Sequence, residues 1–146
     1  MIRCNITEHA QAIAAAAQTT FNTGVDMCLS RVDAEDELLG GVIFTAYTGT
    51  SIHLHMAGFR DNWANRDFLW CTFDYPFNQL GCKKVFGQVP ETNTKALEID
   101  LKLGFKIVTK IDDVYPDGGV YVLSMSRDDC KWLSVKPRHI RSLEET

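Results

Sequence analysis

Residues 84–105 read KVFGQVPETNTKALEIDLKLGF. The first part, Lys84 to Val89, predicts a short strand, which Pro90 ends because proline has no backbone N–H for the ladder. Asn93 or Thr94 then caps a helix that continues through Leu103, since both side chains accept hydrogen bonds from first-turn amides. Gly104 ends this helix. The stretch therefore predicts a strand followed directly by a capped helix.

A second strand is predicted from Phe105 to Ile111, immediately after the helix. We expect the two strands to be parallel neighbours joined by a right-handed crossover, which is the usual hand of such units. The spacing of apolar residues in the helix places one set toward the sheet. These inward residues are Ala96, Leu97 and Leu101.

The residues before this unit predict helices and a hairpin. A helix is expected from Thr7, its N-cap, to about Phe21, followed by a loop with a short helix at residues 22–36. Residues 38–47 and 51–58 predict two antiparallel strands around the Thr48-Gly49-Thr50 turn. Residues 65–80 predict a helix in which Pro76 causes a kink or a local break near residue 73.

After the unit, Asp117-Gly118-Gly119 predicts a turn and residues 120–127 a last strand. We expect a single domain at residues 1–133, with a C-terminal tail at residues 134–146. The fold class is α/β (α+β), a mixed sheet with helices on both faces.

Composition excludes several classes of function. The 146 residues carry a net charge of −4, without the clustered basic residues that bind nucleic acid. No apolar run is long enough to cross a membrane, and no secretory leader is visible. The five cysteines are scattered without a C-x-x-C pair, which favours reduced thiols. We expect a cytoplasmic protein with no nucleic-acid or membrane partner.

Three segments together resemble a known family. They are YPFNQLGCKKV (75–85), VPETNTKA (89–96) and KLGF (102–105). In this order and spacing they resemble GNAT-superfamily N-acetyltransferases, closest to the branch of the ribosomal-protein N-terminal acetyltransferases. Small phage-encoded acetyltransferase-like proteins are also similar, including a closing RDDCKWL (127–133). The resemblance implies a GNAT-like, mostly antiparallel twisted sheet with helices on both faces.

The resemblance also implies acetyl-CoA as co-substrate, lying where the fourth and fifth strands separate. A backbone N–H near Ala57 would then meet the thioester oxygen as it gains charge. In the pyrophosphate loop, Arg60 matches the family pattern, but Trp63 and Asn65 stand where the family has small residues. Asn93 matches a family contact to the pantetheine arm, or is a plain N-cap. The implied cofactor-binding residues are Met56, Ala57, Gly58, Phe59, Arg60, Trp63, Ala64, Asn65 and Asn93.

The acceptor amine must lose a proton, so a general base is expected. His53 and His55 share one face of the strand at residues 51–58, and Glu37 precedes the strand before it. Each histidine is otherwise a structural, hydrogen-bonded residue. A metal site on the two histidines lacks a third ligand, so we expect no metal. In many family members a tyrosine protonates the departing thiolate, but Asp100 stands at that position, so the usual acid is absent.

The sequence therefore predicts an enzyme that moves an acetyl group from acetyl-CoA to an amine by direct attack in a ternary complex. The acceptor is a protein N-terminus, a Lys side chain or a small amine, and the segments 22–36 and 114–119 would select it. The alternative is a catalytically inactive GNAT-fold interaction protein, such as a phage-type host-binding or virion component. A homodimer is the assembly expected on general grounds.

Overall fold

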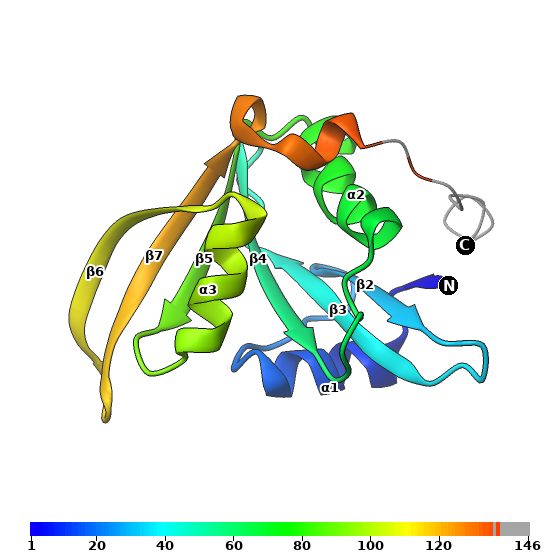
Figure 1. Cartoon of the computed structure of the whole chain (residues 1–146), viewed down its shortest axis with the longest axis horizontal. Helices are drawn as coiled ribbons and strands as arrows, with labels where there is room; N and C mark the ends of the chain where they lie inside the picture. The colour runs from blue at the N-terminus through cyan, green and yellow to red at the C-terminus, as the bar shows by residue number, and fades with distance from the viewer. Residues whose placement is uncertain (136, 138–146) are drawn as a thin grey trace.

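The computed structural model describes residues 1–135 and residue 137. In this part of the chain the strands form one sheet in the spatial order β1-β2-β3-β4-β5-β7-β6 (Figure 1). Only β4 and β5 run parallel, and the other neighbouring pairs are antiparallel. The strands are β1 (Ile2–Cys4), β2 (Met27–Val32), β3 (Leu38–Thr45), β4 (Ser51–Gly58), β5 (Lys84–Pro90), β6 (Lys106–Tyr115) and β7 (Gly118–Ser126). The predicted mixed, mostly antiparallel sheet is confirmed.

Three α-helices in the described part of the chain cover the sheet, and they lie on both of its faces (Figure 1). Helix α1 (Thr7–Ala16) packs Ile13 and two alanines against β2 and β3 in a small core on one face. Helices α2 (Arg66–Asp74) and α3 (Thr94–Leu103) lie on the other face, over a larger core that includes Phe68, Phe73 and Leu123. The expectation of helices on both faces is therefore confirmed.

The predicted crossover pair of strands is wrong. β5 and β6 are not neighbours, because β7 lies between them and pairs antiparallel with both. Alternate residues of β7 are buried, as suits a central strand, whereas nearly every residue of β6 is exposed, as suits an edge. The parallel pair is instead β4 with β5, which are connected through α2.

Other boundaries also differ from the sequence-based expectations. Residues 22–36, expected as a loop, contain β2, and the short β1 was not expected at all. Helix α1 ends at Ala16, and Thr7 is its first residue rather than its cap, which is Ile6. Leu101, expected to face inward, is 43% exposed.

The kink or local break expected near residue 73 takes the form of a change of helix type. The α-helix ends at Asp74, and Tyr75–Gln79 continue as a π-helical turn that contains the proline. Residues 127–129 and 131–134 form short 3-10 turns, and most of the predicted tail at 134–146 lies outside the described residues. Among the described helices, none has both the length and the apolar character of a membrane span.

Candidate active site

The sheet is open at its centre, where β4 and β5 separate. Their pairing covers only Ser51, Ile52 and His53 of β4, opposite Lys84, Val85 and Phe86 of β5. β4 continues for five more residues, to Gly58, and β5 continues to Pro90. Beyond His53, therefore, the edge of β4 that faces β5 has no strand partner within the described residues. Backbone N–H and C=O groups on such an edge are free to bind an extended ligand.

The hydrogen bonds to β3 identify which backbone groups face the gap. The amide of Phe59 donates to the carbonyl of Leu39 at 2.9 Å. In an antiparallel ladder this direction alternates, so the amides of Ala57 and His55 also point toward β3. The amides of Met56 and Gly58 point into the gap. The resemblance implied an oxyanion donor near Ala57. Because the Ala57 amide points toward β3, this donor must be the amide of Met56 or of Gly58.

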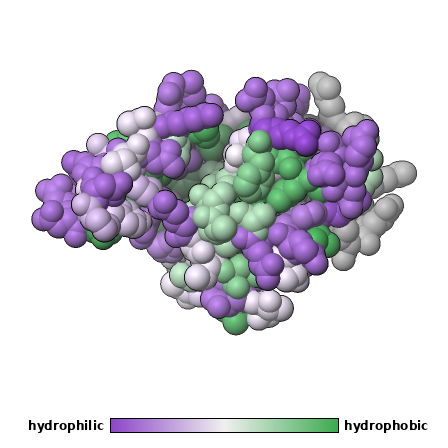
Figure 2. Space-filling model, turned by 90° about the horizontal axis from the view of Figure 1, so that it is seen from below, coloured by the Kyte–Doolittle hydropathy of each residue, from purple (hydrophilic) through white to green (hydrophobic). Residues whose placement is uncertain are grey.

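A hollow of about 510 Å³ occupies the open end of this gap. From below, a recess lies between hydrophilic residues on the left and apolar residues near the centre (Figure 2). Arg60 and Lys95 are the basic residues on its walls, and Asp61 is the exposed acid. The lining consists of residues 56–63 together with Ala16, Asn93, Lys95, Ala96, Ile99 and Asp100.

A smaller hollow of about 110 Å³ adjoins the first between the end of α1 and the separated strands. It is more polar, and the side chains of Gln18, His55, Gln88 and Asp100 are among its walls. The rest of its lining consists of Ala16, Ala17, Leu54, Met56, Gly87, Val89, Pro90, Asn93, Ala96 and Phe105. The two hollows thus meet between β4 and α3.

Trp63 fixes the loop between β4 and α2. Its indole lies against two paired glycines, Gly40 of β3 and Gly58 of β4, and forms an edge contact with Phe68, whose ring centroid is 6.0 Å away. Trp63 also lines the larger hollow. The indole fills the space that the missing side chains of Gly40 and Gly58 leave, which explains how the loop holds a bulky residue where a glycine was expected.

The neighbours of Trp63 divide between the hollow and the fold. The guanidinium of Arg60 is 3.8 Å from the carboxylate of Asp33, and its side chain remains 58% exposed on the wall of the larger hollow. Ala64 packs against the larger core, and Asn65 accepts a hydrogen bond from the amide of Phe68 as the N-cap of α2. Neither Ala64 nor Asn65 lines the hollows.

His55 lies at the wall of the smaller hollow and is held in place. Its Nε2 lies 2.9 Å from the hydroxyl of Thr45 on β3. Burial lowers its pKa below the usual value of 6.5, with a smaller contribution from His53. The imidazole is therefore neutral at pH 7, the form that can accept a proton.

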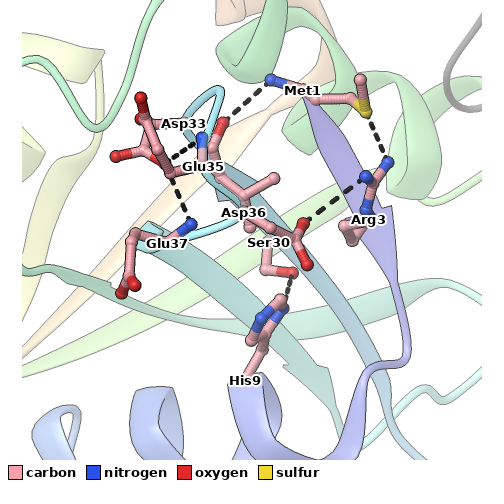
Figure 3. A network of polar contacts seen from close by, with 9 residues as sticks. Met1, Arg3, His9, Ser30, Asp33, Glu35, Asp36 and Glu37 are labelled. Carbon is pink, nitrogen blue, oxygen red and sulfur yellow. Dashed lines mark hydrogen bonds and ion pairs between the residues drawn. The ribbon is translucent and has the colours of Figure 1, made fainter.

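The other two base candidates lie elsewhere. His53 stands two residues earlier on β4, packs against Phe86, and lines neither hollow. Glu37 is exposed in the β2–β3 turn, where its backbone N–H donates to Asp33 (Figure 3). Neither hollow includes Glu37 in its walls. Of the three predicted catalytic residues, the structure brings only His55 to the site.

Helix α3 supplies the opposite wall. Asn93 caps it by accepting a hydrogen bond from the amide of Ala96 at 3.2 Å, and it also lines both hollows, so its two interpretations are compatible. Lys95, Ile99 and Asp100 were not predicted as site residues. Asp100 had been noted only as the residue at the position of the family's tyrosine, and its helical spacing from Ala96 also places it on the inward side of the helix.

In the described residues no group of three or more His, Cys, Asp or Glu side chains is arranged to hold a metal ion. Protein-family models give no match to the chain, and curated protein sequences give none either.

Solved structures do match. Spermidine N-acetyltransferase from Vibrio cholerae, in complex with CoA and spermine, superposes with a TM-score of 0.69 at 14% identity, covering 92% of this chain and 98% of that one. Ribosomal-protein-S5-alanine acetyltransferase from Vibrio fischeri gives 0.61 at 17% identity, covering 73% of this chain and 64% of that one. The chain therefore has the fold of the GNAT N-acetyltransferases.

Proposed function

We propose that the protein transfers an acetyl group from acetyl-CoA to an amine. The observation that carries this proposal is the unpaired edge of β4 beside two connected hollows. Acyl transfer needs a donor and an acceptor to meet at one carbon with fixed hydrogen-bond donors nearby. The larger hollow offers the donor side and the smaller one the acceptor side. The spermidine enzyme of the same fold, which was solved with CoA and spermine, supports this assignment.

The gap suits the pantetheine arm of coenzyme A, which is extended and carries amide groups. Such amides pair with the free N–H and C=O groups of Leu54, Met56 and Gly58 in the way that an added strand does. Beyond them the phosphates come near Arg60 and Lys95. Arg60 and Lys95 would thus bind the phosphates in place of the family's small-residue loop, which has a small residue at the position of Trp63.

His55 is the proposed general base. The amine nitrogen attacks the thioester carbonyl directly, and His55 takes the proton that the nitrogen sheds, either itself or through a water molecule. The amides of Met56 and Gly58 stabilise the charge that develops on the carbonyl oxygen. Thr45 holds the imidazole ring at a fixed angle to the hollow.

The acceptor is an amine, and its identity is the open part of the proposal. The neighbours of known structure are named for spermidine and for the alanine of ribosomal protein S5, a small amine and a protein N-terminus. The smaller hollow presents Gln18, Gln88 and Asp100, which suit a cationic acceptor. We retain the homodimer and the cytoplasmic location as proposals, the latter supported by five free cysteines.

The first experiment is titration with acetyl-CoA in a calorimeter, with Trp63 fluorescence followed in parallel. Micromolar affinity, about 8 kcal/mol, with a change in Trp emission supports the site. A Trp63→Phe variant assigns the emission change to the loop, because the other tryptophans remain. Release of the CoA thiol is then measured with spermidine, spermine, free lysine and an N-terminal peptide.

Two outcomes contradict the proposal in different ways. No binding at near-millimolar acetyl-CoA removes both the donor site and the enzyme. Tight binding without thiol release from any amine in the panel supports the alternative, a GNAT-fold interaction protein that has lost its chemistry.

A further inference from the structure

The start of α2, beside the loop that the resemblance assigned to the pyrophosphate, is occupied by side chains of the protein itself. Asn65 accepts a hydrogen bond from the first-turn amide of Phe68 at 2.9 Å, so this amide is not free for a phosphate. Asp67 lies in the same turn, where a carboxylate takes the place that the helix dipole offers to an anion. Arg66 begins the helix but lines neither hollow. The N-terminus of α2 therefore offers little to a bound phosphate.

The loop that precedes α2 is held against the sheet. The guanidinium of Arg31 on β2 donates a hydrogen bond to the carbonyl of Asn62. The indole of Trp63 lies against Gly40 and Gly58. A loop of small residues lets its backbone amides come close to a pyrophosphate, whereas this loop carries a bulky aromatic ring. The loop therefore packs onto the sheet instead of presenting small residues to a ligand.

The charges on the walls of the larger hollow suit one phosphate group better than several. The pyrophosphate and the 3′-phosphate of coenzyme A together carry about four negative charges at pH 7. Arg60 and Lys95 are the basic residues on these walls, and Asp61 is an exposed acid among them. Arg60 is shared, because its guanidinium lies 3.8 Å from the carboxylate of Asp33. The walls therefore provide less positive charge than would balance the whole of coenzyme A.

The pantetheine arm of the donor, in contrast, meets groups that match its chemistry. The unpaired edge of β4 presents the backbone groups of Leu54, Met56 and Gly58 to the two amides of the arm. Phe59 and Ile99 add apolar surface to the walls of the larger hollow, and they are 43% and 36% exposed. Such side chains suit the two methyl groups that the arm carries next to its phosphate, because apolar groups gain free energy on leaving water.

We propose that the protein recognises its donor through the 4′-phosphopantetheine arm and not through the nucleotide, so that S-acetyl-4′-phosphopantetheine is a donor as well as acetyl-CoA. This inference rests on the proposed function. The chemistry is the same for both donors. The amine nitrogen bonds to the carbonyl carbon, the bond from that carbon to sulfur breaks, and its electron pair goes to sulfur. The amine loses one proton, and the released thiol gains one.

The first test compares three donors, with an amine that the wild type acetylates from acetyl-CoA. We expect kcat/KM for S-acetyl-4′-phosphopantetheine to lie within about tenfold of the value for acetyl-CoA. S-acetylpantetheine, which has no phosphate, should fall by about a further tenfold, because its charge-assisted hydrogen bonds to Arg60 and Lys95 are lost. A larger fall from acetyl-CoA to the phosphopantetheine donor overturns the inference. Equal values for the donors with and without the phosphate overturn the role given to that phosphate.

Lys95→Gln and a matched control, Lys102→Gln, locate the phosphate that the donors share. Both lysines are exposed on α3, but Lys102 pairs with Glu98 and lines neither hollow. Lys95→Gln should raise KM by about tenfold for acetyl-CoA and for the phosphopantetheine donor alike, and should leave S-acetylpantetheine unchanged. Lys102→Gln should behave as the wild type with all three. A loss confined to acetyl-CoA would place Lys95 at the nucleotide and overturn the inference.

Binding to the free protein gives a readout that does not depend on turnover. Calorimetry should give dissociation constants for coenzyme A and for 4′-phosphopantetheine that agree within about tenfold. Adenosine 3′,5′-bisphosphate, the nucleotide part alone, should not displace coenzyme A at about 1 mM, and displacement overturns the inference. If no amine is acetylated from any of the three donors, the proposed function itself has failed, and calorimetry still decides which part of coenzyme A the hollow binds.

Discussion

Gly58→Ala tests whether Trp63 sets the shape of the loop that borders the larger hollow. A Cβ at Gly58 would lie 2.6 Å from Cε2 of the indole and closer still to two other ring atoms, and all three of its nearest neighbours belong to Trp63. Ordinary contact begins near 3.4 Å, so the indole must move. Overpacking of this kind costs about 1–3 kcal/mol, which corresponds to a Tm lower by about 2–12 °C for a chain of this size.

The same change should cost nothing once the indole is gone. In a Trp63→Ala background the three atoms nearest to the new Cβ are gone, and Gly58→Ala should gain about 0.5–1 kcal/mol, because alanine loses less entropy than glycine in a strand. The expected coupling energy between the two sites is therefore about 1.5–4 kcal/mol. Urea denaturation of the four proteins of this cycle measures it.

Gly40→Ala is the control. Its Cβ would lie 2.6 Å from Cε3 of Trp63 but also 2.8 Å from the carbonyl oxygen of Ala57, which is backbone. Removal of the indole leaves that second clash, so most of the cost should persist in the Trp63→Ala background. A coupling below about 0.5 kcal/mol for Gly58, or full rescue of Gly40→Ala, would refute the placement of the indole.

Three further predictions follow from side chains around the site. His55→Gln should lower kcat by about 10²-fold, whereas His53→Gln should change it little, as steady-state kinetics at pH 7 will show; equal effects would remove His55 as the base. Glu91 accepts from Lys110 at 2.6 Å, and this lysine and an amide lower its pKa, so Glu91→Gln should destabilise the protein at pH 7. That difference in unfolding free energy should start to shrink as the pH falls below 4.5 and should be lost once the pH is below the lowered pKa of Glu91; a difference that acid leaves unchanged contradicts the ion pair. Because burial raises the pKa of Asp100 to about 7, the free energy of unfolding should fall from pH 4 to pH 7, by at most about 4 kcal/mol. Asp100→Asn should remove this pH dependence, which urea titrations measure.

The local chemistry of the sequence predicts the centre of the fold well. Proline at the end of β5, asparagine before α3 and glycine after it each act on the adjacent backbone; the helix boundaries hold in the structure, and the strand ends at Pro90 itself, one residue later than predicted. The β3–β4 hairpin follows from alternation and a short turn in the same way. These features depend on residues a few positions apart, which a single sequence displays.

The parts that failed depend on contacts distant in the chain. β2 was missed because residues 28–30 are all buried, so the strand shows no alternation. β7 lies between β5 and β6 because it pairs antiparallel with both, and a single sequence does not reveal which strands pair. The same limit applies to the site, since Asp100 and His55 come to one cavity only through the separation of β4 from β5.

The short parallel pairing has a mechanical consequence. Three residue pairs form the seam between two stiff ribbons, β1 to β4 on one side and β5, β7 and β6 on the other. Such a sheet bends most easily at its seam. A molecule bound along the open edge of β4 would contact both halves of the sheet and restrict this bending. Hydrogen–deuterium exchange should therefore be fast at the amides of Met56 and Gly58 in the free protein and slow when coenzyme A is added. The amide of His55, which pairs with β3, should exchange slowly in both states.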